Sequence, residues 1–135
     1  MSEVTFIVRK WVKPGDLNQH GALFGGRLLQ WVDEEAAIVA ITQLGTIDVV
    51  TRHISAIDFV ARADRGDLLE IEYRVKGFGR TSLTLSCRVF NTVTGQDILL
   101  LDSMVFVAVD SEGHPVEHGQ VEATPGTERV RHAHA

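Results

Sequence analysis

The stretch that decides the fold runs from residue 18 to residue 42 and reads NQHGALFGGRLLQWVDEEAAIVAIT. Its first part, up to Gly26, is rich in glycine and follows neither a helical nor a strand period. From Gly25 onward the apolar residues recur at helical spacing, with Gln30 and Glu34 on the opposite side. This apolar stripe comprises Leu28, Leu29, Val32, Ala36, Val39 and Ala40. The pattern predicts one long helix over residues 25–42 that packs closely against a sheet.

The segments on both sides of this helix are typical of strands. Residues 4–12 alternate apolar and polar side chains and end at the turn-forming Lys13-Pro14-Gly15-Asp16. After the helix, four segments rich in β-branched and aromatic residues follow: 48–60, 69–75, 81–89 and 98–109. The last of them is apolar on both faces, which predicts a central position or a subunit contact. We therefore predict an α+β protein with one long central helix wrapped by a curved, five-stranded antiparallel sheet.

Length and composition set the domain organisation. A chain of 135 residues is near the usual size of one domain. We place that domain in residues 1–110. The remaining residues, 111–135, are polar and contain two prolines, which predicts a C-terminal tail that is mobile or only loosely docked.

Charge and cysteine content exclude several classes of function. The formal net charge of −5, without a basic cluster, argues against nucleic-acid binding. No apolar run is long enough for a membrane span, and we expect no signal peptide. The single cysteine, Cys87, forms no internal disulfide, so we expect a cytoplasmic protein. The spacing of histidine and cysteine predicts no metal site.

The candidate chemistry lies in the same stretch that decides the fold. Gly25 and Gly26 at a helix start let a ligand approach unpaired backbone N–H groups, where the helix dipole favours negative charge. Asp33 lies on the flank of the apolar stripe, where a carboxylate needs a partner or a catalytic role. Each residue alone also has a structural interpretation: a turn for the glycines and for Asn18, and a satisfied structural acid for Asp33. Their combination at fixed spacing favours function.

That combination resembles a known family. The pattern Asn18-x-x-Gly21-x-x-Phe24-Gly25-Gly26, with Asp33 seven residues on, is similar to the signature of hotdog-fold acyl-CoA thioesterases. The closest group is the bacterial YciA-like and mammalian brain and cytosolic acyl-CoA hydrolase type. The resemblance covers roughly residues 14–109 and continues through Val50-Thr51, Ile57-Asp58-Phe59, Gly66-Asp67 and Gly79-Arg80-Thr81-Ser82. One position departs from it, since Arg62 stands where the family commonly has proline.

The resemblance implies a role for each matching residue. Asp33 would act as general base on water, or as nucleophile through an acyl-enzyme anhydride. Asn18, from the partner subunit, would position water or the thioester. Backbone N–H groups at Gly25 and Gly26 would polarise the thioester carbonyl. Thr51 would hydrogen-bond the carboxylate or the substrate. Arg80, with its neighbours Thr81 and Ser82, would contact coenzyme A, whose phosphate is a candidate partner for the guanidinium.

The resemblance also implies the substrate and the assembly. The substrate would be acyl-CoA, hydrolysed to free fatty acid and coenzyme A without a further cofactor. The protein would be a homo-oligomer, with a dimer as the unit and a hexamer as a trimer of dimers. Two rivals on the same fold are a hydratase, which generally needs a site histidine in a motif that we do not find, and a non-catalytic acyl-CoA sensor. A purely structural oligomer is the third alternative.

Overall fold

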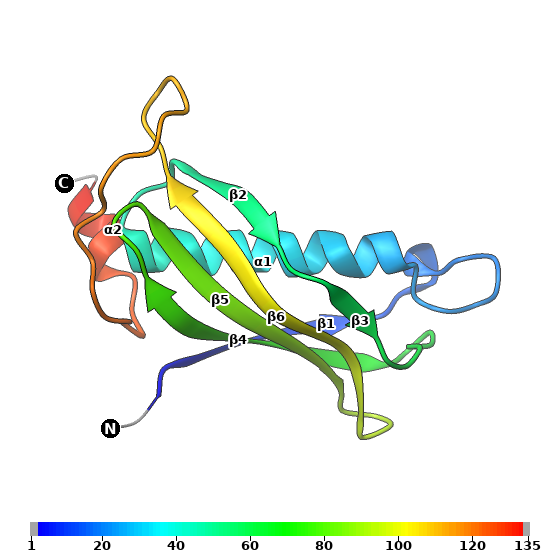
Figure 1. The fold of residues 1–135 in the computed structure, drawn as a ribbon. Helices are drawn as coiled ribbons and strands as arrows, with labels where there is room; N and C mark the ends of the chain where they lie inside the picture. The colour runs from blue at the N-terminus through cyan, green and yellow to red at the C-terminus, as the bar shows by residue number, and fades with distance from the viewer. Residues whose placement is uncertain (1–2, 134–135) are drawn as a thin grey trace.

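The computed structural model describes residues 3–133. Its elements follow one another in the chain as a strand, a short turn of 3-10 helix, a long helix, five strands and a short C-terminal helix (Figure 1). They are β1 (Thr5–Trp11), η1 (Pro14–Asp16), α1 (Gly25–Leu44), β2 (Val49–Ile54), β3 (Ile57–Phe59), β4 (Leu68–Phe78), β5 (Ser82–Asn91), β6 (Gln96–Ala108) and α2 (Glu128–Ala133).

The strands form one antiparallel sheet in the order β1-β4-β5-β6-β2, and β3 also pairs with β6. The sheet curves along α1, which lies across one of its faces (Figure 1). The predicted layer of one long helix wrapped by a curved antiparallel sheet is therefore confirmed. For residues 98–109 we predicted a central position or a subunit contact, and the central position is confirmed, because β6 lies between β5 and β2.

The predicted number of five strands is wrong. The described residues contain six, because the segment predicted as one strand over residues 48–60 divides into β2 and β3. The chain leaves the ladder at Ser55 and Ala56, where the Ser55 N–H donates to the Ser103 carbonyl and the Ser55 hydroxyl accepts from the Ser103 N–H. These bonds satisfy the backbone at the break. The Ser55 hydroxyl thus takes the place of a backbone acceptor. An apolar run in the sequence does not show where a side chain will replace the backbone hydrogen bonding between two strands in this way.

The helix α1 buries the predicted stripe against the sheet. Leu28, Val32, Ala36, Val39 and Ala40 are all buried. They pack on buried side chains of β4, β5 and β6, among them Ile71, Tyr73, Leu83, Leu85 and Met104. The helix ends at Gly45, which adopts a φ of 74° that a residue with a Cβ rarely takes. Within residues 3–133, neither helix is long and apolar enough to cross a bilayer.

The C-terminal part of the tail contacts the end of the helix α1. Gln43 of α1 is fully buried, and its amide exchanges two hydrogen bonds of 2.9 Å with the backbone of Thr124. Arg129 donates to the carbonyl of Gln43 at 2.8 Å. The short helix α2, which the sequence did not predict, lies beside the end of α1 (Figure 1). The mobility of residues 111–135 stays a prediction, and residues 134–135 lie outside the described part.

Candidate active site

An ion-dipole pair between α1 and β2 forms the centre of the candidate site. The hydroxyl of Thr51 donates to Oδ1 of Asp33 at 2.8 Å. Asp33 is half-buried, on the side of α1 that faces β2. The bond occupies one carboxylate oxygen and leaves Oδ2 without a partner among the described residues. The arrangement holds a carboxylate in one orientation with a free oxygen available for a proton or an electrophile.

A β-bulge accompanies Thr51. The register of β2 against β6 shifts between Thr51 and His53, so that Thr51 pairs with Phe106 and His53 with Val105. Bulges re-aim side chains and are frequent beside functional sites. The alternation of a regular strand does not predict this shift.

An apolar cavity of about 280 Å³ opens beside Asp33. It lies between α1 on one side and β2, β3 and β6 on the other. The residues that line it are Leu29, Gln30, Val32, Asp33, Ile54, Ile57, Leu101 and Met104. A carboxylate at the rim of an apolar cavity suits a ligand that has a polar reactive group and an apolar chain.

A buried phenol supports the helix behind Asp33. Tyr73 is fully buried, and its O–H donates to the carbonyl of Val32 at 2.6 Å. Burial raises the pKa of this phenol above its ordinary value, so it remains a donor at neutral pH. The bond links β4 to the residue immediately before Asp33. The sequence alone did not predict this bond, although a tyrosine on a buried strand face needs a hydrogen-bond partner.

The single cysteine does not offer a nucleophile. Cys87 is buried in the strand β5. Burial raises the pKa of its thiol to about 12. The thiolate is the nucleophilic form of cysteine. Cys87 is therefore inert near neutral pH, and Asp33 remains the candidate reactive group of this site.

The start of α1 presents free backbone donors. Its N-cap is Phe24, which supplies no side-chain cap. Among the described residues, the N–H groups of Gly25, Gly26 and Arg27 have no hydrogen-bond acceptor. A Cβ on Gly26 would lie 2.9 Å from the ring of the exposed Phe24, so a larger residue there would require the ring to move. These N–H groups point out of the N-terminal end of α1, where the helix dipole stabilises negative charge.

Asn18 organises the loop before the helix. Its Oδ1 accepts the N–H of His20 at 2.8 Å and that of Ala22 at 3.1 Å. The loop lies beyond the N-terminal end of α1 (Figure 1). Among the described residues no hydrogen bond joins Asn18 to Asp33. Within one chain the structure therefore brings Thr51 to Asp33 but not Asn18.

The predicted coenzyme A segment forms the tight turn between β4 and β5. The N–H of Gly79 donates to the Ser82 carbonyl at 2.9 Å, and Arg80 and Thr81 are the central residues. The guanidinium of Arg80 pairs with Glu117 of the tail. A Cβ on Gly79 would lie 2.3 Å from Oγ of Ser82, so a larger residue there would require the Ser82 hydroxyl to rotate away. The role of Arg80, Thr81 and Ser82 in substrate binding stays a prediction.

No metal-binding group is found in the part of the chain that the structure describes: no three His, Cys, Asp or Glu side chains gather there as ligands. The absence of a metal and of a further cofactor from the reaction stays a prediction.

Comparison with known families identifies residues 20–97 as a match to the thioesterase superfamily. A curated relative, the uncharacterized acyl-CoA thioester hydrolase YkhA of Bacillus subtilis, is 33% identical over 108 residues. That match covers 78% of this chain and 62% of the relative. The chain thus spans less than two thirds of that relative's length.

Solved structures give the same family. An apo-hexameric acyl-CoA thioesterase superposes with a TM-score of 0.73 at 35% identity, covering 96% of this chain and 83% of that one. An acyl-CoA hydrolase from Staphylococcus aureus, in complex with butyryl coenzyme A, coenzyme A and coenzyme A disulfide, superposes with a TM-score of 0.73 at 28% identity, covering 96% and 79%. Structures of this hydrolase also exist with alanine in place of an asparagine, a threonine or an aspartate.

The sequence match over residues 20–97 and the superposition with solved thioesterases lead to the same family. The chain belongs to the thioesterase superfamily, and the family resemblance and hotdog fold that its sequence predicted are confirmed.

Proposed function

We propose that this protein is an acyl-CoA thioesterase in which Asp33 carries the chemistry. The observation that carries the proposal is the Asp33 carboxylate, held by Thr51 at 2.8 Å on the rim of an apolar cavity. The alanine variants of the S. aureus hydrolase support it, because the asparagine and aspartate replaced there stand 15 residues apart, as Asn18 and Asp33 do. The substrate and product of this reaction contain coenzyme A, and no further cofactor is needed.

The chemistry follows from the free carboxylate oxygen. As general base, Asp33 takes a proton from water while the water oxygen attacks the thioester carbonyl. As nucleophile, the carboxylate attacks the carbonyl itself, and water then hydrolyses the acyl-enzyme anhydride. In both cases the carbon–sulfur bond breaks, and coenzyme A leaves as the thiol after taking up a proton. Backbone N–H groups at Gly25 and Gly26 stabilise the negative charge on the carbonyl oxygen.

The complete site combines two subunits. Gly26 and Asp33 are seven residues apart on α1, which places them about 10 Å apart along the helix axis. One thioester carbonyl cannot contact both within a single chain. A partner helix that runs in the opposite direction brings its own Gly25 and Gly26, and its Asn18 loop, to this Asp33. A shared site therefore requires a dimer as the smallest active unit.

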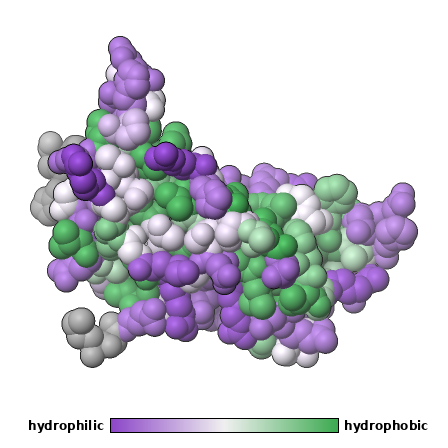
Figure 2. Space-filling model, viewed as in Figure 1, coloured by the Kyte–Doolittle hydropathy of each residue, from purple (hydrophilic) through white to green (hydrophobic). Residues whose placement is uncertain are grey.

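Exposed apolar residues support this assembly. Phe24 at the helix start, Ile38 on α1 and Val50 on the edge strand β2 are each about half exposed in the isolated chain. Figure 2 shows further apolar side chains gathered over β3 and the adjoining part of β6, where Phe59, Val60 and Leu100 are exposed. Large exposed apolar patches mark interaction sites. We expect a dimer as the unit and a hexamer as the complete assembly, as named for relatives.

A panel of acyl-CoA substrates with a thiol-detecting dye tests the function. A thioesterase releases free coenzyme A from at least one member of the panel, and the Asp33→Asn variant releases it far more slowly. Tight acyl-CoA binding without thiol release would instead show a non-catalytic acyl-CoA sensor. Light scattering that finds a monomer at micromolar concentration would contradict the shared site. The buried, inert Cys87 agrees with the reducing cytoplasm in which we place the protein.

A further inference from the structure

Three strands make polar contacts with α1, and all three contacts fall on one turn of the helix, residues 32–35. Within the described part of the chain, these pairs are Thr51 of β2 with Asp33, Tyr73 of β4 with Val32, and Lys10 of β1 with Glu35. The turn that carries the candidate reactive carboxylate is therefore the turn that directional bonds attach to the sheet.

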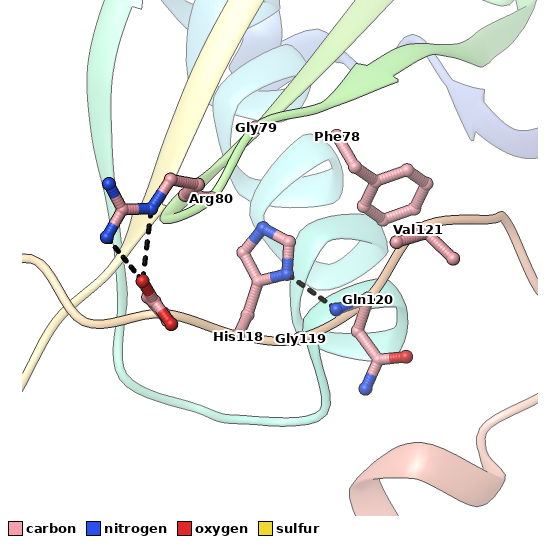
Figure 3. A pocket seen from close by; sticks show the side chains of 8 residues that line it. Phe78, Gly79, Arg80, His118, Gly119, Gln120 and Val121 are labelled. Atoms are coloured by element: carbon pink, nitrogen blue, oxygen red, sulfur yellow. Dashed lines mark hydrogen bonds and ion pairs between the residues drawn. The ribbon is translucent and has the colours of Figure 1, made fainter.

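The other polar contacts of α1 lie at its two ends. Near the start of the helix Arg27 pairs with Asp16 at 3.5 Å, and near its end Gln43 bonds to Thr124 of the tail. Residues 117–121 of the tail, drawn in Figure 3, form an ion pair with the β4–β5 turn and not with the middle of α1. The position of residues 32–35 thus depends on their bonds to the sheet.

The bond of Tyr73 is the best protected of the three contacts. Its side chain is fully buried, whereas the side chains of Lys10 and Glu35 are 30% and 18% exposed. Water screens a partly exposed ion pair, whereas a buried hydrogen bond keeps its strength. Burial raises the pKa of the phenol, and the negative charges of Cys87, Glu35 and Asp33 raise it further. The phenol therefore remains a donor at neutral pH.

The apolar face of α1 does not by itself fix the helix at one place on the sheet. Val32, Ala36 and Ala40 are buried but small, and the gain from burying apolar surface has no direction. A hydrogen bond does have a direction. Val32 and Asp33 are consecutive, about 100° apart around the helix axis. A bond that holds the Val32 carbonyl therefore also fixes where the next carboxylate meets Thr51.

We propose that Tyr73 is a positioning residue of the active site, which through the Val32 carbonyl holds Asp33 where it acts on the thioester. This inference rests on the proposed function and adds to it a residue of β4 behind the helix. Tyr73 acts through α1 and does not touch the substrate. Misplacing a reacting group by about 1 Å costs up to about 10²-fold in rate, while contacts with the rest of the substrate remain. Loss of the phenol therefore lowers kcat and leaves KM nearly unchanged.

Thiol-release kinetics of Tyr73→Phe test the inference, because this substitution removes only the hydroxyl. Inside α1 the Val32 carbonyl keeps the amide of Ala36, four residues on, as a donor, so no buried acceptor loses its last partner. We expect kcat to fall about tenfold and KM to stay within about twofold of the wild type. A Tyr73→Phe enzyme with the kcat of the wild type would overturn the inference.

The pH profile separates positioning from proton transfer. Since Tyr73→Phe leaves the proton acceptor in place, kcat falls by the same factor at every pH, and the profile keeps its shape. Loss of one limb of the profile would show that the phenol itself transfers a proton, and a positioning role would be wrong.

Ile71→Val is the matched control. Ile71 is fully buried, two residues before Tyr73 on the same strand and the same face. The substitution removes one methyl group from the same core and leaves the bond between the phenol and α1 intact. Its kcat should equal that of the wild type. A fall in kcat as large as in Tyr73→Phe would show a general sensitivity to core packing and overturn the inference.

The double variant Thr51→Val, Tyr73→Phe tests whether both bonds position the same carboxylate. Residues that act through one network show coupled effects. Tyr73→Phe should therefore cost less kcat in the Thr51→Val background than in the wild type. Effects on kcat that simply multiply would show that Tyr73 does not act through Asp33.

NMR of protein isotopically labelled at the aspartate carboxyl carbons tests the inference without turnover. The Asp33 signal, identified by its loss in Asp33→Asn, should move in Thr51→Val and in Tyr73→Phe and stay in place in Ile71→Val. An unmoved signal in Tyr73→Phe overturns the inference whether or not the protein hydrolyses acyl-CoA. A moved signal in a protein that releases no thiol means that the proposed function fails, while Tyr73 still sets the position of the carboxylate.

Discussion

The hydroxyl of Thr51 donates to the carboxylate of Asp33 across the gap between β2 and α1, at 2.8 Å. The two residues are 18 positions apart in the sequence, and the helix end, the turn at Gly45 and the start of β2 lie between them. The bond fixes the rotamer of the carboxylate and leaves its second oxygen free.

Asp33→Asn keeps the shape of the side chain and removes its basicity and nucleophilicity. Turnover of acyl-CoA should fall by roughly 10²–10⁴-fold, the usual contribution of a positioned general base. Binding of coenzyme A, measured by calorimetry, should remain. A variant with near wild-type turnover would show that Asp33 is structural.

Thr51→Val keeps the branched shape and removes the hydroxyl. The carboxylate then loses its orienting donor, and kcat should fall about tenfold, while the free energy of unfolding changes by less than about 1 kcal/mol because the site is open to water. Thr51→Ser retains the donor and should retain most of the activity. Equal kcat values for the valine and serine variants would contradict an orienting role.

Mixing two inactive chains tests the shared site. Asn18→Ala and Asp33→Asn proteins, each inactive alone, should regain part of the activity after dissociation and reassembly. In the mixed dimer one site combines an intact Asn18 with an intact Asp33, and the other site carries both lesions. Recovery therefore stays well below the wild-type level.

An intrasubunit site makes the opposite prediction for the same mixture. Every site would keep one lesion, whatever its neighbour, and no activity would return. Mass spectrometry confirms that subunits have exchanged. Absence of rescue in exchanged dimers would place Asn18 and Asp33 of one site in the same chain.

The buried thiol predicts a loss of stability in alkaline solution. Burial raises the pKa of Cys87 from 9.0 to about 12. Below about pH 9 the thiol is protonated in both the folded and the unfolded state, and its contribution to stability is fully present. Between about 9 and 12 only the unfolded state releases the proton, so the free energy of unfolding falls by up to about 1.4 kcal/mol per pH unit.

Urea unfolding on both sides of this window measures the effect. Cys87→Ala should lower stability near neutral pH and reduce the slope above about pH 9. The Tyr73 phenol, whose pKa burial also raises, keeps part of the slope at higher pH. Ser86→Ala, on the same strand, is the control that leaves the slope unchanged. An identical slope in the wild type and in Cys87→Ala would exclude the thiol as its source.

The buried amide of Gln43 predicts a stabilising role for the tail. Gln43→Ala leaves the backbone N–H and carbonyl of Thr124 without the partners they have in the core. The free energy of unfolding should fall by about 1–3 kcal/mol, the cost of unsatisfied buried polar groups. Gln96→Ala, at an exposed position, should have little effect. Equal stability of Gln43→Ala and the wild type would show that the tail does not contribute to the core.

The sequence by itself determined the layers of the fold. The helical period of the apolar stripe from Leu28 to Ala40 and the alternation in β4 and β5 each specify a buried face. The buried face can be predicted from the local sequence, because the position of a side chain in the helical or strand repeat decides which face of the element it lies on. The same local information located Asp33 as a carboxylate on the flank of the core and placed glycines at the helix start.

Only the tertiary structure decided which of these residues meet. Thr51 meets Asp33 beside the bulge in β2, and the chain leaves the ladder between β2 and β3 where Ser55 bonds to Ser103. The bonds of Gln43 to Thr124 and of Arg80 to Glu117 join segments 81 and 37 residues apart. Hydrogen bonds and ion pairs are directional and join particular atoms, so periodicity, which specifies faces, does not predict them.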